Sequence, residues 1–282
     1  MAALALALLQ ACSAVKLAYN NAPEFGYWWL DGYADFNESQ SPKVREELTR
    51  LLLWHRTEEL PKLADMLQKT QRLASSDLAP AQVCTVFSDL RTRFDAVIPQ
   101  SEAAAVSLAM SLTPAQILHI ERKFTKGNAE WREKWLDLTP TKRIEKRLTS
   151  NRERSEEFYG GLDEKQIAVL RAGLEASVFD PQLSYAERTR RQQDLLQTLR
   201  RISVTQGSPP SQAEALVAMR AVIARSLSSP NPAYRAYNDN VIAESCAVFA
   251  KVHNSTTPDQ RARAVRRLAA YERDARELSS QK

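Results

Sequence analysis

A helix-start signal recurs along this chain and constrains its fold more than any other feature. The clearest copy is Leu112-Thr113-Pro114-Ala115-Gln116. In it Thr113 can cap free backbone amides, Pro114 suits the first helical position, and Gln116 can complete a capping box. The irregular spacing of the copies argues against a solenoid repeat. Variants of the signal occupy residues 78–82, 162–166 and 257–260.

Composition supports an all-α fold. Only 7 of the 282 residues are glycine, and good helix formers dominate the chain while alternating strand patterns are nearly absent. We therefore predict an elongated, multi-helix and mostly antiparallel bundle. The expected helices cover 23–36, 42–73 with a kink or break at Pro61, 80–98, 102–110, 114–137, 140–158, 164–179, 184–203, 211–228, 233–252 and 258–279.

The chain divides into three parts. Residues 1–11 have the character of a signal peptide, residues 12–22 look like a tether, and residues 23–282 form one helical domain. The stretch Gln206-Gly-Ser-Pro-Pro-Ser211 is the best loop, and it places a possible subdomain joint near 204–211.

The start of the chain resembles the lipobox of bacterial lipoproteins. Residues 3–9 form an uncharged apolar run, too short to span a bilayer, and the run ends in Leu9-Gln10-Ala11-Cys12. In lipoproteins this cysteine carries acyl chains such as palmitate and becomes the mature N-terminus, which implies lipidation of Cys12. Residues 1–11 lack the basic segment that opens a signal peptide, so we expect the true start upstream or misassigned. The alternative is a short buried apolar segment that ends in cysteine.

Several further stretches resemble an uncharacterised family of proteobacterial lipoproteins, known only as a domain of unknown function. They are residues 13–23, 27–33, 54–61 and 253–261, so the resemblance covers nearly the whole mature chain. Ser13 follows the cysteine where lipoproteins retained in the inner membrane carry Asp. The resemblance therefore implies an outer-membrane lipoprotein that faces the periplasm, and it implies no particular activity.

The Leu-Thr-Pro-Ala-Gln element is also similar to the Leu-Thr-x-x-Gln motif of Spy and CpxP-type periplasmic proteins. Those proteins are envelope-stress chaperones or sensors with long helices and a basic concave surface. The present chain differs from them in size, in its anchor and in an aromatic N-terminal block. Helix capping alone accounts for the motif, and a chaperone-like role is what the resemblance adds.

Positive charge is concentrated between residues 122 and 154, where 11 basic and 5 acidic residues give a local net charge of +6. Interleaved acids are typical of a solvated helix face. The alternative is a basic binding surface for anionic head groups or an acidic partner, formed by Lys142, Arg143, Lys146 and Arg147. An exported protein is not expected to bind nucleic acid.

Aromatic side chains crowd the first predicted helix, at Phe25, Tyr27, Trp28, Trp29, Tyr33 and Phe36. Two interpretations are open. The rings can touch the membrane interface near the anchor, where amphipathic rings are favoured. They can also form the most deeply buried part of the core, which we favour because aromatic rings dominate core energetics.

Two cysteines remain if Cys12 is acylated, an even number in an oxidising compartment. Cys84 and Cys246 each precede a phenylalanine by three residues, so each thiol would share an apolar helix face with that ring. We predict a disulfide between them. The alternative is two separate buried thiols.

The chain lacks the usual local signatures of catalysis and phosphate binding, and we expect no enzyme, metal or cofactor. His55 with Glu58 or Glu59 is read as a partly buried histidine bonded to a glutamate. Asp31 and Asp35 are expected to pair with arginine or to cap a loop.

Together these features predict a lipid-anchored envelope protein that binds a protein client or an envelope component, as a chaperone-like protein or a stress accessory. The alternative is an anchored scaffold for one protein complex, and an enzyme with an unrecognised site comes third. The predicted partners are the membrane, through the anchor, and such a client.

Overall fold

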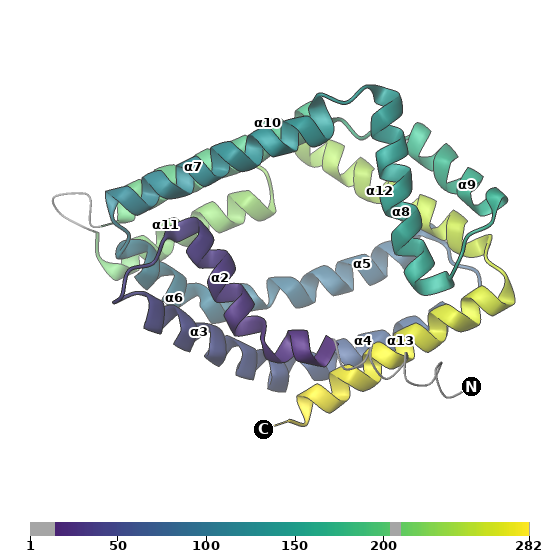
Figure 1. Ribbon diagram of the computed structural model, residues 1–282, viewed down its shortest axis with the longest axis horizontal. Coiled ribbons are helices and arrows are strands. Elements are labelled where there is room, and N and C mark those ends of the chain that lie inside the picture. The colour runs from purple at the N-terminus through teal and green to yellow at the C-terminus, as the bar shows by residue number, and fades with distance from the viewer. Residues whose placement is uncertain (1–14, 204–209, 282) are drawn as a thin grey trace.

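The computed structural model describes residues 15–203 and 210–281, and within these residues the chain forms helices and no strand (Figure 1). The prediction of an all-α, multi-helix fold is confirmed. The helices are α2 (Ala22–Ala34), α3 (Ser41–Trp54), η1 (His55–Glu59), α4 (Leu60–Leu73), α5 (Pro80–Asp95), α6 (Val97–Met110), α7 (Pro114–Trp131), η2 (Arg132–Leu136), α8 (Pro140–Tyr159), α9 (Glu164–Glu175), α10 (Pro181–Ile202), α11 (Gln212–Leu227), α12 (Pro232–Asn254) and α13 (Pro258–Ser279).

Several helix boundaries differ from the prediction. Helix α6 begins at Val97 and not at residue 102, and α5 ends at Asp95 and not at residue 98. Local capping explains the shifts of α9 and α10. Helix α9 ends at Glu175 because the next amides bond elsewhere: Val178 N–H donates to the Glu244 carboxylate. Helix α10 begins at Pro181, three residues early, because the Asp180 carboxylate accepts from the next free amides and Pro181 suits the first position.

The long helix expected over 42–73 forms, with a change of register in the middle. Residues 55–59 are a π-helical turn between α3 and α4. Pro61 has no backbone N–H to give to the preceding turn, and it stands at the start of α4, where none is required. The proline therefore resets the helix without breaking it.

The helices pack in the same pattern in two halves of the chain. The first half comprises α2–α7 and the second half α8–α13. In the first half α2 contacts α3 and α7, and α3 contacts α6. The equivalent contacts in the second half are those of α8 with α9 and α13, and of α9 with α12. Four of the contacts between the halves form two equivalent pairs. The contact of α4 with α13 is equivalent to that of α10 with α7, and the contact of α5 with α12 is equivalent to that of α11 with α6. Figure 1 shows corresponding helices on opposite sides of the centre. Within the described residues, the fold is therefore two interlocked units, one built on α2–α7 and the other on α8–α13.

The apolar core is divided among these helix contacts. The largest cluster lies among α2, α6, α7, α10 and α11 and includes Val106, Ile117, Ile202 and Val222. Smaller clusters join α4 to α13, α5 to α12, α8 to α9 and α12, and α8 to α13. The largest cluster and the α4–α13 and α5–α12 clusters join helices of the two halves, whereas the α8–α9–α12 and α8–α13 clusters lie within the second half.

Paired glutamines hold helix starts of each half together. Gln116 Nε2 donates to Gln40 Oε1 at 2.7 Å and Gln40 Nε2 donates back at 3.3 Å. Gln166 and Gln260 exchange the same two bonds at 2.7 and 3.1 Å. Each of these glutamines also accepts from the amide at the start of its own helix, so one side chain caps a helix and joins it to another.

Asn37 and Gln40 form a further capping pair, which the sequence analysis did not identify. Gln40 N–H donates to the Asn37 carboxamide oxygen at 3.0 Å, and Asn37 N–H donates to Gln40 Oε1 at 3.1 Å. This pair stands in the first half where Asp163 and Gln166 stand in the second. The recurring signal therefore marks equivalent helix starts of two related halves, not a tandem array.

The tether expected over residues 12–22 is wrong for the part that the structure describes. Residues 15–20 are helical, Lys16 forms ion pairs with Asp274 and Glu277 of α13, and Tyr19 bonds to His55 at 2.9 Å. Apolar contact of Tyr19 with the α4–α13 cluster adds to this attachment. The signal peptide, Cys12 and most of the predicted joint at 204–211 lie outside the described residues.

No single helix of the described chain is long and apolar enough to cross a bilayer. Residues 80–110 and 114–136 satisfy the length and composition test only as a pair, and that pair is bent by 115°.

Candidate functional site

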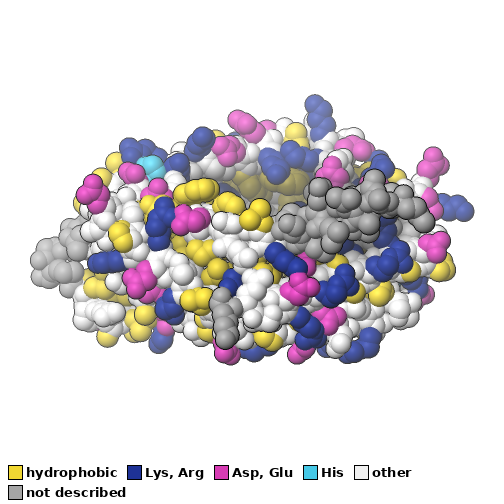
Figure 2. Space-filling model, turned by 60° about the horizontal axis from the view of Figure 1, so that its bottom comes forward, with side chains coloured by type: hydrophobic (Ala, Val, Ile, Leu, Met, Phe, Trp, Pro, Cys, Tyr) yellow, Lys and Arg dark blue, Asp and Glu magenta, His cyan; other side chains and the backbone are white. Residues whose placement is uncertain are grey.

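One face of the molecule is hollowed near its middle, and hydrophobic side chains line the hollow (Figure 2). Lysine, arginine, aspartate and glutamate side chains are interspersed around it. A surface of this kind offers apolar contact within a charged rim, which is the usual anatomy of a protein-binding surface.

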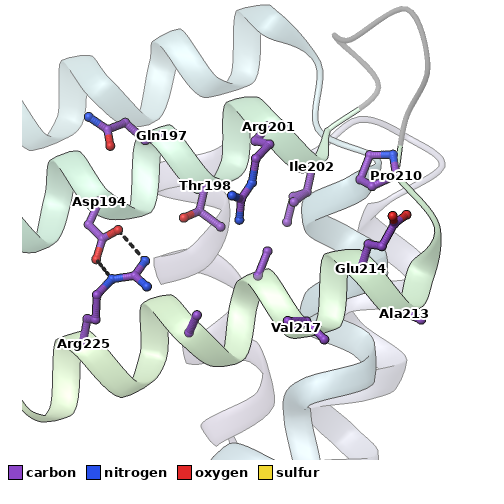
Figure 3. A pocket seen from close by; sticks show the side chains of 12 residues that line it. Asp194, Gln197, Thr198, Arg201, Ile202, Pro210, Ala213, Glu214, Val217 and Arg225 are labelled. Atoms are coloured by element: carbon purple, nitrogen blue, oxygen red, sulfur yellow. Dashed lines mark hydrogen bonds and ion pairs between the residues drawn. The ribbon is translucent and has the colours of Figure 1, made fainter.

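A pocket of about 930 Å³ lies between α10 and α11 (Figure 3). The middle of the α11 wall, between Glu214 and Arg225, is apolar, and Val217 on it is 67% exposed. Arg201 extends from α10 into the space between the two helices. The pocket is thus an open apolar trough with a cation on one side. Its lining residues are Asp194, Gln197, Thr198, Arg201, Ile202, Pro210, Ala213, Glu214, Val217, Ala218, Ala221 and Arg225.

A bidentate ion pair closes one end of this pocket. Arg225 donates to both carboxylate oxygens of Asp194, at 2.7 and 2.8 Å, and Arg190 lies 3.5 Å from the same carboxylate. The Arg225 hydrogen bonds lower the pKa of Asp194 against the opposing effect of burial. Asp194 is therefore held ionised as a structural partner. Glu214, which also lines the trough, accepts from the Ser211 amide and hydroxyl at the start of α11, both at 2.8 Å.

The predicted basic surface on α8 divides into two kinds of residue. Arg143 donates to the Trp135 and Leu138 carbonyls, both at 2.8 Å, and so satisfies the end of the preceding helix. Arg147 donates to Ser177 and stacks over a phenylalanine ring, and burial lowers its pKa. Lys142 and Lys146 are exposed. Only these two lysines stay available to a partner.

The histidines serve the fold. His253 is 1% exposed. Its Nδ1 is hydrogen-bonded to the Tyr159 hydroxyl at 2.9 Å, and its Nε2 is hydrogen-bonded to the Ser76 carbonyl oxygen at 2.8 Å. His55 bonds to the Tyr19 hydroxyl, which corrects the glutamate partner expected from the sequence. Burial lowers the pKa of both imidazoles. Among the described residues no three histidine, cysteine, aspartate or glutamate side chains are grouped to hold a metal.

The two carboxylates on the aromatic helix have separate roles. Asp31 accepts from the Phe36 amide at 2.9 Å and so caps the loop after α2, as the sequence suggested. Asp35 ends the helix in a left-handed conformation, with φ of 50°.

The expectation of a deeply buried aromatic block is wrong for half of α2. Tyr27 is buried at 8% exposure, but Phe25, Trp28 and Trp29 are 52%, 60% and 65% exposed. The three exposed rings are spaced by three and four residues, so they share one outward face. The sequence showed the rings but not which stripe would meet the core.

Cys84 on α5 and Cys246 on α12 are joined by a disulfide, with Cα atoms 5.4 Å apart. The phenylalanines three residues later, Phe87 and Phe249, meet edge to face with ring centroids 5.9 Å apart. The repeated Cys-x-x-Phe spacing therefore does place thiol and ring on the same face of each helix. The bond connects helices from the two halves.

The comparison with known proteins decides the family but no activity. Residues 32–217 match the model described as "Family of unknown function (DUF6279)". The chain belongs to this family. The matched region of DUF6279 contains the last residues of α2, the basic helix α8 and part of the pocket on α10 and α11, whereas Phe25, Trp28 and Trp29 precede it. No curated protein and no solved structure is significantly similar to the chain.

Proposed function

We propose that this DUF6279 protein is a lipid-anchored envelope protein that binds exposed apolar segments of other proteins and catalyses no reaction. The observation that carries the proposal is the open trough between α10 and α11. Its volume is about 930 Å³, the middle of its α11 wall is apolar, and Arg201 stands opposite to receive a carboxylate or a backbone carbonyl.

The ionisable groups of the trough support binding over catalysis. Asp194 is committed to Arg225, Glu214 caps the start of α11 through Ser211, and His55 and His253 lie in structural bonds elsewhere. A general acid or base needs a free group within hydrogen-bond reach of a substrate. Apolar binding in a charged rim needs no such group.

The attachment to the membrane rests on the lipobox-like stretch that ends at Cys12. Periplasmic orientation follows from the same stretch together with Ser13. Under this proposal the protein holds its trough close to the envelope surface, where newly exported chains pass in an unfolded state.

A binding assay with a permanently unfolded client tests the proposal. Val217→Asp places a charge on the apolar wall and should weaken binding of fluorescent, reduced and carboxymethylated α-lactalbumin by roughly tenfold, the effect of about 1.4 kcal/mol. Leu118→Asp is the matched control, because Leu118 is 50% exposed on α7 and does not line the trough. Equal affinities for both variants and the wild type would contradict the proposal.

The exposed lysines of α8 give a second arm to the same assay. The double variant Lys142→Glu/Lys146→Glu should lower the affinity for the unfolded client only if the basic helix α8 belongs to the binding surface. Arg143 and Arg147 stay unchanged, because they hold neighbouring backbone and side-chain groups in place.

The alternative function, an anchored scaffold for one complex, is favoured by a different observation, the exposed aromatic face of α2. A scaffold predicts one stoichiometric partner and indifference to unfolded clients. Crosslinking from the envelope distinguishes the two functions, because a chaperone yields many partners and a scaffold yields one.

A further inference from the structure

The aromatic face of α2 is an exposed hydrophobic surface that the trough does not use. Phe25, Trp28 and Trp29 point away from the fold and are more than half exposed. Phe25 and Trp28 touch each other, with ring centroids 5.9 Å apart, so they form a continuous patch. Large exposed aromatic groups of this kind mark interaction surfaces.

The inner face of α2 fixes the orientation of this patch. Tyr27 is buried, its hydroxyl donates to Ser41 at 3.0 Å, and its ring lies 3.6 Å from the Arg45 guanidinium carbon. Arg45 also pairs with Glu24, which neutralises the acid in the first turn of α2. The contacts of Tyr27 therefore keep α2 in one orientation, with the exposed rings outward. Because Arg45 neutralises Glu24, this acid repels an anionic surface less when the helix approaches it.

The patch lies close to the proposed anchor. Cys12 precedes Val15 by three residues, which span at most about 11 Å even when extended. Val15 begins the helical segment that Lys16 and Tyr19 attach to α13 and η1. From Val15 to Phe25 the helical path is about 15 Å at 1.5 Å per residue. An acylated Cys12 would thus bring the membrane surface within reach of the rings.

We propose that Phe25, Trp28 and Trp29 dock into the head-group region of the lipid bilayer that holds Cys12. The inference rests on the proposed lipid attachment. Aromatic rings are favoured at this depth, where an apolar body and polar groups are both accommodated. Docking adds a second contact to the acyl chains and sets the orientation of the protein on the membrane, with α2 against the lipid.

Tryptophan quenching by brominated lipid tests this inference on the full acylated protein. The protein is purified from membranes and reconstituted in vesicles of phosphatidylethanolamine and phosphatidylglycerol that contain dibromo-phosphatidylcholine. The chain has five tryptophans, at positions 28, 29, 54, 131 and 135. The variant Trp28→Phe/Trp29→Phe keeps the patch apolar but removes its reporters. The matched control Trp131→Phe/Trp135→Phe removes the same number of tryptophans, one from the end of α7 and one from η2.

Docking predicts that the fraction of fluorescence quenched falls at least about twofold in the Trp28→Phe/Trp29→Phe variant and rises in the control, because interfacial rings sit within bromine contact. Mass spectrometry of the N-terminal peptide accompanies each sample. An acylated Cys12 with unquenched Trp28 and Trp29 would overturn docking and leave the anchor standing. A peptide without acyl mass would overturn the anchor itself. Emission that shifts with protein concentration before vesicles are added would assign the patch to a second copy and overturn docking.

Discussion

Glutamine side chains at helix starts do two tasks at once in this fold. Gln166 is 1% exposed, caps α9 through the Asp163 amide and bonds to Gln260 and to the Ser255 carbonyl. The sequence predicted the cap, because a capping box depends only on residues three apart. It could not predict the pairing of glutamines, which depends on how two distant helix starts meet.

Removing the side-chain amide of Gln166 should lower the free energy of unfolding by more than removing an ordinary capping side chain. Gln166→Ala leaves buried donors and acceptors without partners, so we expect the free energy of unfolding to fall by about 2 kcal/mol. Gln82→Ala is the matched control. Gln82 is exposed and accepts only from the Ala79 amide, so its loss should cost about 0.5 kcal/mol. Urea denaturation measures both, and equal losses would argue against a special role for the pair.

Glu187 makes stability depend on acid pH. Burial raises its pKa, but hydrogen bonds from Arg190, Arg191 and Ser229 outweigh the burial and hold the pKa at about 2. Its folded pKa lies below the unfolded value of 4.5, so the stabilisation is complete above about pH 4.5 and is lost as the pH falls towards 2. We expect a loss of about 3 kcal/mol in that window.

Urea unfolding at a series of pH values checks this expectation. Glu187→Gln keeps the shape of the side chain but cannot titrate, so its stability should be lower at neutral pH and flatter between pH 4.5 and 2. If the stability of Glu187→Gln fell as steeply with pH as that of the wild type, other carboxylates would be responsible for the acid dependence.

At the scale of helices, the sequence predicted where helices form better than it predicted which face of each helix is exposed. Caps and prolines placed most helix starts, including the reset at Pro61. The aromatic helix shows the limit. Tyr27 and the patch of Trp28 and Trp29 lie on opposite faces of an all-round apolar helix, and periodicity alone does not say which face meets α3 and α7.

The link between α5 and α12 should contribute strongly to stability. The Cys84–Cys246 bond closes a loop of 162 residues, and in the chain-entropy model so long a loop stabilises by up to about 5 kcal/mol. Cys84→Ala/Cys246→Ala should therefore lower the urea midpoint markedly. Wild-type protein in reductant should approach the variant, whereas a variant as stable as the oxidised wild type would contradict this role.

At the scale of the whole molecule, two halves interlock by exchanging partners. The pairs α4–α13 and α7–α10 join the halves on opposite sides, as do α5–α12 and α6–α11 (Figure 1). The sequence contained the signal for this arrangement in its matching capping boxes, but the boxes are unequally spaced. A difference in helix length between the halves hides the relation along the chain and leaves it visible only in space.

The trough was also beyond sequence analysis, for a physical reason. Val217 and Arg201 belong to consecutive helices, but their approach depends on the angle between α10 and α11. The basic helix α8 was visible as charge, yet the commitment of Arg143 and Arg147 to the fold depends on contacts with distant carbonyls and a serine.

The central claim is that the protein works from a membrane through Cys12, and one measurement tests it most directly. Cells are grown with an alkyne-labelled fatty acid, the protein is isolated, and label and N-terminal mass are recorded for wild type and Cys12→Ser. The account predicts acyl label on the wild-type N-terminal peptide at Cys12 and none on the variant, which should also fail to mature. A wild-type N-terminal peptide with no acyl mass, together with unchanged membrane fractionation of Cys12→Ser, would contradict it.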